Sequence, residues 1–303
     1  MKVFVGRPLV EPSTAEILAG HDVVFGAGGL PASEWPLLAA VDVLLPTPGE
    51  RVTEAILAAA PHLGLVASHS VGVDHVDLEA CRRRGIRVTN TPDVLTEATA
   101  DLAWALILAV ARRIREGEAL VRSGSWDGWK PRELLGVSLQ GKTLGIYGMG
   151  RIGRSVARRG EAFGMRVVAF DRGQSEEDFG EFLSKVDVLS IHVPLTDATR
   201  GRFGEREFRR MKEAAILVNT ARGPIVDETA LVAALSSKRL LGAGLDVYQR
   251  EPQIHPGLVF LPNVVLLPHL GSATFETRLA MARLACEEIA RFARGEPPLH
   301  QVA

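Results

Sequence analysis

Residues 144–171 read LGIYGMGRIGRSVARRGEAFGMRVVAFD: an apolar run, three glycines at G-x-G-x-x-G spacing, a helical stretch, and a second apolar run that ends on an aspartate. This order is typical of a strand, a tight turn, a helix and a parallel strand. Gly148 permits the turn, Gly150 lets a pyrophosphate approach the backbone, and Gly153 lets the helix pack close to the strand. The N–H groups at the helix start, near Arg151, favour an anion. The stretch therefore predicts a dinucleotide-binding β-α-β unit.

The second apolar run ends on Asp171, which stands 18 residues after Gly153. At the end of the second strand a carboxylate can accept both hydroxyls of an adenosine ribose. It would repel a 2′-phosphate, so the sequence predicts NAD as the cofactor. The neighbouring Arg172 could offset that repulsion, which leaves NADP open as an alternative. Because the chain holds 30 glycines, the spacing alone could mark an ordinary turn, but the flanking strands and the acidic strand end favour dinucleotide binding.

The composition is that of a globular chain with an apolar core. Its 303 residues are 47% apolar, which is enough for two domains of ordinary size. The net charge of −1 and the pI near 6.7 argue against a nucleic-acid partner, since no basic face dominates. The triplet RRR at 82–84 is expected to lie on a solvated helix end.

The number of cysteines and the hydropathy of the chain indicate where in the cell the protein is located. Cys81 and Cys286 are the only cysteines, too few for a disulfide framework or a thiolate metal site. We therefore expect no metal and a reduced, cytoplasmic location. The N-terminal MKVFVGRPLV lacks a signal-peptide core. The longest apolar run, at 102–111, is shorter than the ~20 residues that cross a membrane, so we expect no membrane partner and a buried helix there.

Short apolar runs alternate with helical patterns along the whole chain, which is typical of parallel sheets with crossover helices. A first set of strands is expected at 2–5, 22–25, 42–46, 63–68 and 86–90. A second set is expected at 144–148, 166–170, 187–193, 215–220, 241–247 and 263–268. The second set would make a complete doubly wound sheet, so the predicted fold class is α/β with parallel sheets.

Helices are expected in the intervals between these strands. Residues 96–117 read as one long helix that joins the two sets, with TEAT supplying caps at its start. A final amphipathic helix is expected at 274–293. The long helix is the natural hinge because it connects the two sheets.

Polar residues at the carboxyl ends of the second set of strands are the candidates for chemistry, because ligands bind outside those ends in open α/β sheets. Arg222 follows the strand AILVNT, Glu251 follows LGAGLDV, and His269 follows NVVLLP. The arginine could equally form a surface ion pair, and the glutamate could be a solvated turn residue. His192 follows another strand and is as well placed as His269, so the residues alone do not choose between the two histidines.

Reduction of a 2-oxo acid needs an arginine, a histidine and a carboxylate of this kind. A guanidinium holds the substrate carboxylate with two parallel hydrogen bonds and polarises the carbonyl. A histidine can protonate the developing alkoxide near neutral pH. A carboxylate bonded to that histidine stabilises the imidazolium, and the cofactor supplies the hydride.

Seven ordered segments resemble the D-isomer-specific 2-hydroxyacid dehydrogenases, and the resemblance covers nearly all of the chain. The segments are SVGVDHVD (70–77), NTPDVLTEATADLAWALILAVARR (90–113), GKTLGIYGMGRIG (141–153), HVPLT (192–196), VNTARGPIVDETAL (218–231), AGLDV (243–247) and LLPHLGSAT (266–274). The resemblance implies two Rossmann-like domains. One is a flavodoxin-like substrate domain of residues 1–97 with 270–303, and the other is a doubly wound dinucleotide-binding domain of residues 98–269.

The same resemblance implies roles for individual residues. It makes Arg222 the substrate-binding arginine, Glu251 the partner acid and His269 the proton donor. His192 falls where the family contacts the adenosine side of the cofactor. The other implied contacts are the N–H groups of Val71 and Gly72 at the substrate carboxylate, Arg151 and Ile152 at the pyrophosphate, Thr99, Thr220 and Asp246 on the nicotinamide side, and Gly271 with Ser272 in the neighbouring loop.

Two stretches, 123–143 and 268–285, resemble the branch that contains the glyoxylate and hydroxypyruvate reductases. The implied substrate is therefore a small 2-oxo acid, reduced to the 2-hydroxy acid. In that branch a tryptophan of the first stretch reaches into the partner subunit's active site, and Trp129 matches it. Alternatively, Trp126 and Trp129 simply bury an interface. Both interpretations imply a homodimer.

Three other functions are compatible with the same fold. A formate dehydrogenase would pair its histidine with glutamine in place of Glu251. Phosphoglycerate dehydrogenases often carry regulatory extensions, whereas this chain stops at Ala303. An NAD(H)-sensing interaction protein of the corepressor type would bind the dinucleotide chiefly to control assembly.

One interval departs from the family pattern. Only 21 residues separate Asp171 from His192, fewer than the family usually has. We therefore expect a shortened crossover beneath the adenine, with the strand ends that carry Arg222, Glu251 and His269 unaffected.

Overall fold

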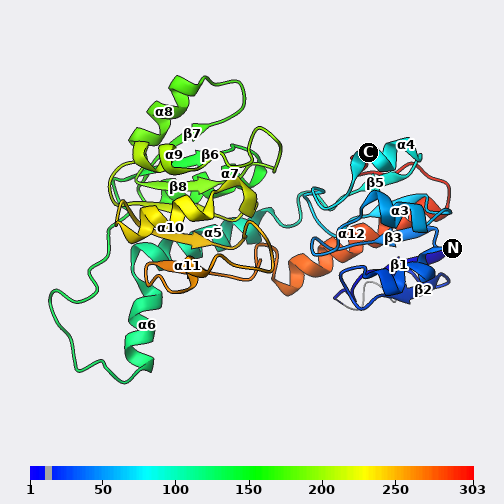
Figure 1. Cartoon of the computed structure of the whole chain (residues 1–303), viewed down its shortest axis with the longest axis horizontal. Helices are drawn as coiled ribbons and strands as arrows, with labels where there is room; N and C mark the ends of the chain where they lie inside the picture. The colour runs from blue at the N-terminus through cyan, green and yellow to red at the C-terminus, as the bar shows by residue number, and fades with distance from the viewer. Residues whose placement is uncertain (11–15) are drawn as a thin grey trace. The chain divides into compact units, whose positions relative to one another are not determined.

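The computed structural model describes residues 1–10 and 16–303, and the chain divides into two compact units. Unit 1 comprises Met1–Leu95 and Ser272–Ala303, and unit 2 comprises Thr96–Gly271. The domain limits predicted from the sequence, after residues 97 and 269, fall close to these divisions. Figure 1 labels the helices and strands of both units.

Unit 1 is built on a five-stranded parallel sheet in the flavodoxin-like order β2-β1-β3-β4-β5. Successive residues of a strand face opposite sides of the sheet. Phe4 and Val66 therefore pack in one core with α3 and α4, while Val3 and Val5 pack in another with α12. The elements are β1 (Lys2–Val5), β2 (Asp22–Phe25), η1 (Ala32–Glu34), α2 (Trp35–Leu38), β3 (Val43–Leu45), α3 (Glu54–Ala59), β4 (Leu65–Ala67), α4 (Leu78–Arg83), β5 (Arg87–Thr89) and α12 (Phe275–Ala293).

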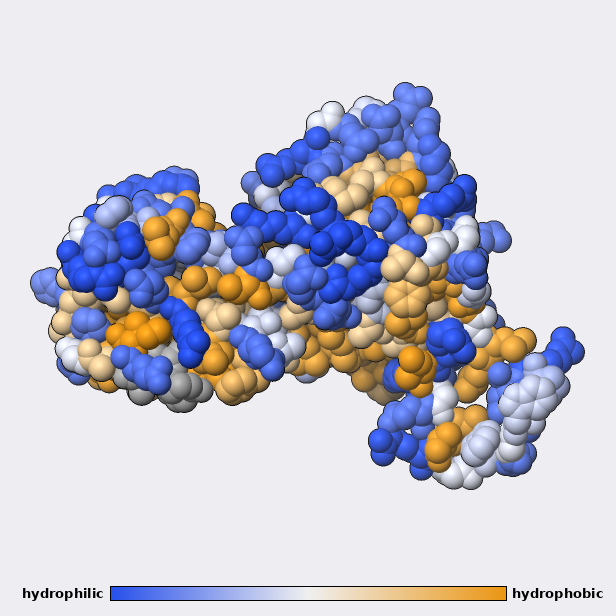
Figure 2. Space-filling view, turned by 180° about the vertical axis from the view of Figure 1, so that it is seen from behind, coloured by the Kyte–Doolittle hydropathy of each residue, from blue (hydrophilic) through white to orange (hydrophobic). Residues whose placement is uncertain are grey.

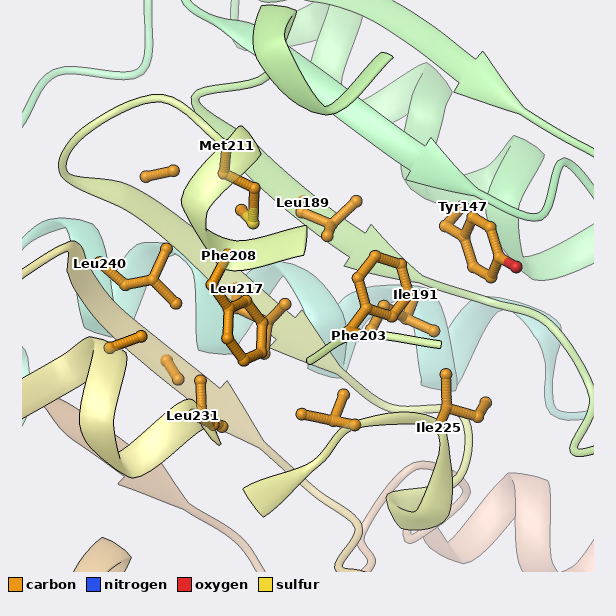
Figure 3. Packing of buried hydrophobic residues seen from close by; sticks show 14 of the residues in the cluster. Tyr147, Leu189, Ile191, Phe203, Phe208, Met211, Leu217, Ile225, Leu231 and Leu240 are labelled. Carbon is orange, nitrogen blue, oxygen red and sulfur yellow. The ribbon is translucent and has the colours of Figure 1, made fainter. Parts of the chain in front are cut away.

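Unit 2 is built on a six-stranded parallel sheet in the order β11-β10-β9-β8-β6-β7. The helices α5 and α7 share one core with the sheet, and α8, α9 and α10 share a second core. Figure 3 shows this second core, in which Phe208, Leu217 and Leu231 come from a helix, a strand and a helix. The elements are α5 (Thr96–Ala111), α6 (Ile114–Arg122), β6 (Thr143–Tyr147), α7 (Arg151–Ala162), β7 (Arg166–Phe170), α8 (Glu176–Lys185), β8 (Val188–Ile191), α9 (Glu205–Arg210), β9 (Ala215–Asn219), η2 (Gly223–Ile225), α10 (Glu228–Ser236), β10 (Leu240–Leu245), α11 (Pro256–Val259) and β11 (Val264–Leu266).

The strand order of unit 2 departs from that of most dinucleotide-binding domains. Counted along the chain it is 2-1-3-4-5-6, whereas the usual order is 3-2-1-4-5-6. The chain passes from β7 to β8 through α8 alone. Among residues 1–10 and 16–303, no strand lies beyond β7, which forms an edge of the sheet. The short interval between Asp171 and His192 is therefore a crossover that lacks the outer strand.

The long helix predicted at 96–117 is wrong beyond residue 111. α5 ends at Ala111, and α6 begins after Arg113, whose backbone is left-handed with a φ of 53°. The carbonyl oxygen of Ala111 accepts a hydrogen bond from the N–H of Val137, so it does not accept from the N–H four residues on, as a continuing helix requires. A contact with the returning chain ends the helix, and no local pattern reveals it.

The apolar run at 102–111 lies within α5, where Ala103, Trp104 and Ile107 are buried, as predicted. Among the described residues, no helix combines the length and the hydrophobicity that a membrane crossing needs. The cysteines Cys81 and Cys286 are both buried, in different cores of unit 1.

Candidate active site

The glycine-rich turn joins β6 to α7. Gly148 has a left-handed φ of 99°, and a side chain at Gly153 would collide with the carbonyl oxygen of Gly148. Both positions therefore require glycine. At Gly150, by contrast, a Cβ would meet no atom of the described residues within 4 Å, and this residue caps α7 without a side-chain hydrogen bond. The open space and the uncapped helix start fit a pyrophosphate.

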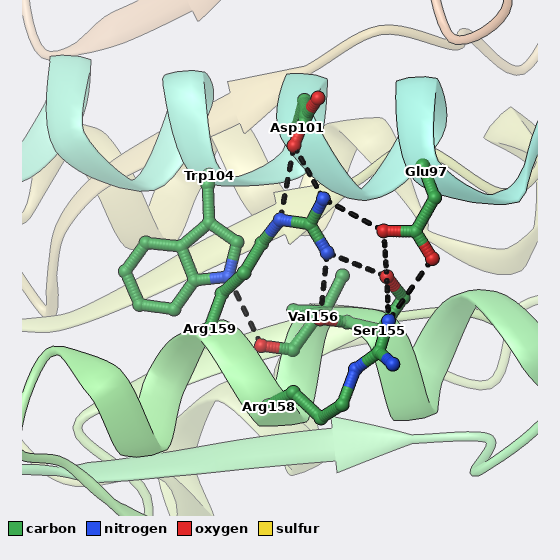
Figure 4. Close-up of polar contacts among 7 residues, drawn as sticks. All are labelled: Glu97, Asp101, Trp104, Ser155, Val156, Arg158 and Arg159. Carbon is green, nitrogen blue, oxygen red and sulfur yellow. Dashed lines mark hydrogen bonds and ion pairs between the residues drawn. The ribbon is translucent and has the colours of Figure 1, made fainter.

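Charged and polar side chains hold α7 against α5 (Figure 4). Arg159 of α7 binds Glu97 and Asp101 of α5, with N–O distances of 2.9 and 2.6 Å. The indole N–H of Trp104 donates to the carbonyl oxygen of Val156 at 3.0 Å. These contacts fix the helix whose first turn carries the glycine-rich loop.

Asp171 follows β7 and lies beside the glycine-rich turn. Its Oδ2 accepts from the N–H of Met149 at 3.3 Å, and its Oδ1 accepts from the N–H of Arg172 at 2.9 Å. The side chain of Gln174 accepts from the N–H of Asp171 at 2.7 Å. The carboxylate is thus exposed at the end of the second strand of the β-α-β unit, where a ribose-binding acid is expected.

The two histidines that the residues alone left equivalent have different surroundings. His192 follows β8, and its Nε2 lies 2.8 Å from Ser190 Oγ. Burial lowers the pKa of His192 to about 3, so this side chain is neutral at physiological pH. A side chain at Gly148 would press on the carbonyl of His192, which places this histidine next to the glycine-rich turn. His269 lies three strands away, after β11.

Arg222 follows β9 in a turn that its neighbours hold tightly. The side-chain amide of Asn219 donates to the carbonyl of Arg222 at 2.9 Å and accepts from the N–H of Ala221 at 3.0 Å. A side chain at Gly223 would collide with the backbone of Tyr248. The loop after β9 therefore packs directly against the loop after β10.

The fully buried Asp246, which directly follows β10, organises the loop after β11. Its carboxylate accepts from the N–H groups of Leu270 and Gly271 at 2.6 and 2.8 Å, and its carbonyl accepts from the N–H of His269 at 3.0 Å. Thr99 Oγ1 donates to the carbonyl of Gly271 at 2.9 Å. Burial raises the pKa of Asp246, and these N–H groups act against that rise. Together the bonds stabilise the left-handed backbone of His269, whose φ is 59°.

His269 and Glu251 form a hydrogen-bonded pair. Glu251 Oε2 accepts from His269 Nδ1 at 2.9 Å, and Glu251 Oε1 accepts from the N–H of Tyr248 at 3.0 Å. Burial favours the neutral carboxyl, but the hydrogen bond from His269, its charge, the N–H of Tyr248 and the charge of Arg222 together lower the pKa of Glu251. With Nδ1–H directed at the carboxylate, Nε2 is the nitrogen that can exchange a proton with a ligand.

The edge of the sheet in unit 2 fits a dinucleotide in three separate places. The first is the open space at Gly150, and the second is the carboxylate of Asp171 beside the turn. The third is Thr220, whose buried Oγ1 has no hydrogen-bond partner among the described residues. An unpaired buried hydroxyl is costly, so it suits a bound polar group such as a carboxamide.

In unit 1 the loop after β4 carries Val71 and Gly72, both half-buried. The carbonyl of Ser70 accepts from the N–H of Thr91, and the carbonyl of Val71 accepts from the side-chain amide of Asn90, both at 2.8 Å. In a trans peptide the C=O and N–H point in opposite directions. The N–H groups of Val71 and Gly72 therefore point away from residues 90 and 91, as a carboxylate-binding loop requires.

Trp129 lies between α6 and β6, in a segment that extends away from the rest of unit 2 (Figure 1). It is 83% exposed, and Trp126 is 54% exposed. Figure 2, seen from behind, shows hydrophobic surface interspersed along this segment. No described contact joins Trp129 to the site residues of unit 2, so the structure does not bring it into this subunit's site.

The remaining predicted residues are placed as follows. Arg151 and Ile152 are the first two residues of α7, directly after the glycine-rich turn. Ser272 lies in unit 1, where its carbonyl accepts from the N–H of Thr274 at 2.9 Å and from Arg278 Nε at 3.2 Å. It therefore supports the start of α12.

Two residues that shape the site were not predicted from the sequence. Asn219 ends β9, and an inspection of every polar residue at a strand end would have found it. Glu228 is buried at the start of α10 and accepts from the N–H of Gln249 at 2.7 Å, which braces the loop that carries Glu251. No local pattern marks Glu228, because its partner lies in another loop.

Comparison with known proteins identifies a family model and relatives that match this chain in sequence. Residues 104–271 match the sequence model of the D-isomer specific 2-hydroxyacid dehydrogenase, NAD binding domain. A glyoxylate reductase of Aeropyrum pernix is 47% identical over 317 aligned positions, which cover 98% of this chain and 94% of that protein.

Solved structures agree with the sequence matches. The TT0316 protein from Thermus thermophilus aligns with a TM-score of 0.94 and 45% identity, covering 100% of both chains. An NADPH-dependent glyoxylate/hydroxypyruvate reductase from Sinorhizobium meliloti, in complex with NADP and malonate, aligns with a TM-score of 0.88 and 34% identity over 100% of this chain and 96% of its own. The chain belongs to the D-isomer specific 2-hydroxyacid dehydrogenase family.

Proposed function

We propose that this dehydrogenase reduces a small 2-oxo acid, glyoxylate or hydroxypyruvate, to the corresponding 2-hydroxy acid. The observation that carries the proposal is the His269–Glu251 hydrogen bond of 2.9 Å, formed at the sheet edge where the loop of Arg222 packs against the loop of Glu251. The names of the relatives support the choice of substrate, since they include glyoxylate reductases and a glyoxylate/hydroxypyruvate reductase.

NADH is the proposed reductant, and bound NADH would supply the hydride. The residues that would hold its pyrophosphate are Gly150, Arg151 and Ile152, and Asp171 would accept the hydroxyls of its ribose. Thr220 would meet the carboxamide through the unpaired Oγ1. Arg172 beside Asp171 keeps NADPH as the alternative.

The chain's own residues would hold the substrate and move one proton. Arg222 would bind the substrate carboxylate and polarise its carbonyl. His269 would give the proton on Nε2 to the oxygen that becomes the hydroxyl. Glu251 stays ionised because its pKa is lowered, so it can stabilise the imidazolium before the transfer and keep Nδ1 as the donor afterwards.

The two units would have separate tasks. Unit 2 is the proposed dinucleotide-binding domain, and unit 1 is the proposed substrate domain, in which the N–H groups of Val71 and Gly72 would bind the substrate carboxylate. We also propose a homodimer in the cytoplasm. The support is the exposed segment with Trp126 and Trp129, which would be covered by a second copy and would place Trp129 in the partner's site.

The activity is tested by the fall in NADH absorbance on addition of glyoxylate, hydroxypyruvate or a panel of larger 2-oxo acids. We expect turnover with the two small acids and a higher kcat/KM with NADH than with NADPH. Tight NADH binding without turnover on any acid would instead favour a dinucleotide sensor.

The homodimer is tested by light scattering with Trp129→Ala and the matched variant Trp35→Phe, since Trp35 is half-buried in unit 1. A monomeric mass for the wild-type protein would overturn the proposed homodimer. A dimeric Trp129→Ala variant with reduced turnover would support the placement in the partner's site.

A further inference from the structure

A group of buried polar side chains lies directly beneath the loop of Val71 and Gly72 in unit 1. Ser68, Ser70 and His75 are 1%, 3% and 8% exposed. Polar side chains are seldom buried this deeply without hydrogen bonds. Three short contacts connect them: Ser70 Oγ to the carbonyl oxygen of Gly72 at 2.6 Å, Ser68 Oγ to Ser70 Oγ at 2.7 Å, and Ser68 Oγ to His75 Nε2 at 3.1 Å.

The directions of these three hydrogen bonds follow from counting protons. A carbonyl oxygen only accepts, so the single hydroxyl proton of Ser70 goes to Gly72. Ser70 must then accept from Ser68, which uses the single proton of Ser68. The contact between Ser68 and His75 can therefore form only if His75 Nε2 carries a proton. The chain runs in one direction, from His75 through both serines to the carbonyl of Gly72.

The carbonyl of Gly72 is the third consecutive carbonyl of this loop that is held by a protein group. Those of Ser70 and Val71 are held by residues 91 and 90, as described above. Because each peptide plane is fixed by its carbonyl, the N–H groups of Val71, Gly72 and Val73 are fixed as well. Among the described hydrogen bonds none has one of these three N–H groups as donor. Three half-buried residues thus present oriented, unpaired donors.

We propose that His75 is a positioning residue for the substrate carboxylate, acting through Ser68 and Ser70 on the peptide plane between Gly72 and Val73. Its Nε2–H orients the serine hydroxyls, which orient that plane and aim the N–H of Val73, a third donor beside those of Val71 and Gly72. The ligand class is a carboxylate, bound by backbone N–H groups. This inference rests on the proposed function for the identity of that carboxylate.

The neighbouring His69 is also buried, but its hydrogen bond does not lead toward the loop of Val71 and Gly72. It is 2% exposed and its Nε2 lies 3.4 Å from the carbonyl of Arg278 in α12. Its hydrogen bond leads to a helix, and the loop of Val71 and Gly72 gains nothing from it. Burial lowers the pKa of His69 to about 4. His69 is therefore a natural internal reference for His75, because it lies in the same unit and outside the hydrogen-bond chain.

The first test determines which nitrogen of His75 is protonated, by long-range 1H–15N NMR of the full-length, 15N-histidine-labelled protein. His75→Gln and His69→Gln spectra assign the two resonances. We expect a protonated Nε2 in His75, either as the neutral Nε2–H tautomer or as the imidazolium. The neutral Nδ1–H tautomer would overturn the inference. This measurement needs no turnover, so it decides the hydrogen-bond chain even if the proposed activity fails.

The second test uses amide side chains of two lengths. The amide nitrogen of His75→Gln reaches the place of Nε2 and can donate to Ser68, whereas that of His75→Asn is too short. We expect His75→Asn and Ser70→Ala to raise KM for the 2-oxo acid about tenfold, the effect of losing one oriented donor to a charged group. His75→Gln should stay within about threefold of wild type.

Controls separate positioning from folding. The NADH dissociation constant should be unchanged in all three variants, because the residues proposed to hold the pyrophosphate, the ribose and the carboxamide lie in unit 2. His62→Gln, at an exposed position of unit 1, should match wild type throughout. Equal KM values for His75→Asn, Ser70→Ala and wild type would overturn the inference, and so would equal losses in His75→Gln and His75→Asn.

Discussion

The two ends of the sheet in unit 2 differ in how deeply their polar side chains are buried and in how much space they leave for a ligand. Where β9 and β10 end, Asn219 and Asp246 are fully buried, and each accepts a hydrogen bond of 3.0 Å or shorter from a backbone N–H. Where β6 and β7 end, Gly150 faces open space among the described residues, and the exposed carboxylate of Asp171 accepts a bond of 2.9 Å only from the adjacent Arg172 and a longer one, of 3.3 Å, from Met149. The proposed catalytic end is held together by protein groups except at Thr220 Oγ1, and the proposed cofactor end leaves room for a ligand.

This difference matches the tasks proposed for the two ends. Groups that stabilise charge in a transition state work best when they are already in place, so the loops of Arg222, Glu251 and His269 brace one another. A cofactor that binds and leaves needs donors and space that no protein group occupies. The crossover that lacks an outer strand lies at the proposed cofactor end, away from the loops of Arg222, Glu251 and His269.

The largest expected effect on activity comes from replacing the proposed proton donor, His269. His269→Ala removes the proposed proton donor to the product oxygen, and we expect kcat to fall by about 10³-fold, within the range for loss of a general acid. Steady-state assays with NADH and glyoxylate measure it. His62→Ala serves as the matched control at an exposed position. Retention of wild-type kcat in His269→Ala would remove His269 from the chemistry.

The inner strands of both sheets could be predicted because they are buried on both faces and read as unbroken apolar runs. The run AILVN coincides with the fully buried β9. The end of α5 could not be predicted, since it depends on the hydrogen bond from Val137, far along the chain. Local periodicity carries information about one segment of the chain. The end of α5 is set by two segments, the helix itself and the one that contains Val137.

The same limit applies to the candidate site. Strand-end position identified Arg222, Glu251 and His269 as candidates, but it identified His192 equally well. The structure separates the two histidines by their partners, a serine for His192 and a carboxylate for His269. Such partners come from different loops, so spacing in the sequence does not reveal them. The chain from His75 to Gly72 was missed for a related reason, because its direction depends on counting protons in three contacts.

A smaller effect is expected from neutralising the partner acid. The pKa of Glu251 is lowered, so this carboxylate is ionised at every pH above its usual titration range and stabilises the imidazolium there. Glu251→Gln keeps the size of the side chain and removes the charge. We expect the alkaline limb of the kcat/KM profile for reduction to move to lower pH, with a loss of about tenfold at pH 8 and a smaller loss at pH 6.

Profiles of kcat/KM between pH 5 and 9 measure this shift. Glu205→Gln, an exposed position at the start of α9, is the matched control and should leave the profile unchanged. A uniform loss at all pH values would show that Glu251 positions His269 without stabilising its charge.

The smallest expected effect concerns the cofactor end and leaves the chemistry intact. Asp171→Asn removes the charge that would repel a 2′-phosphate and keeps Arg172 beside it. We therefore expect the ratio of kcat/KM with NADPH to that with NADH to rise at most about fivefold, because an exposed charge contributes at most about 1 kcal/mol. The kcat at saturating NADH should change little, because the loops of Arg222 and His269 are braced independently of β7. Glu177→Gln, an exposed carboxylate in the first turn of α8, controls for a general change of charge. If Asp171→Asn lowered kcat as strongly as Glu251→Gln, the two ends would be coupled, and the independence inferred from their hydrogen bonds would be wrong.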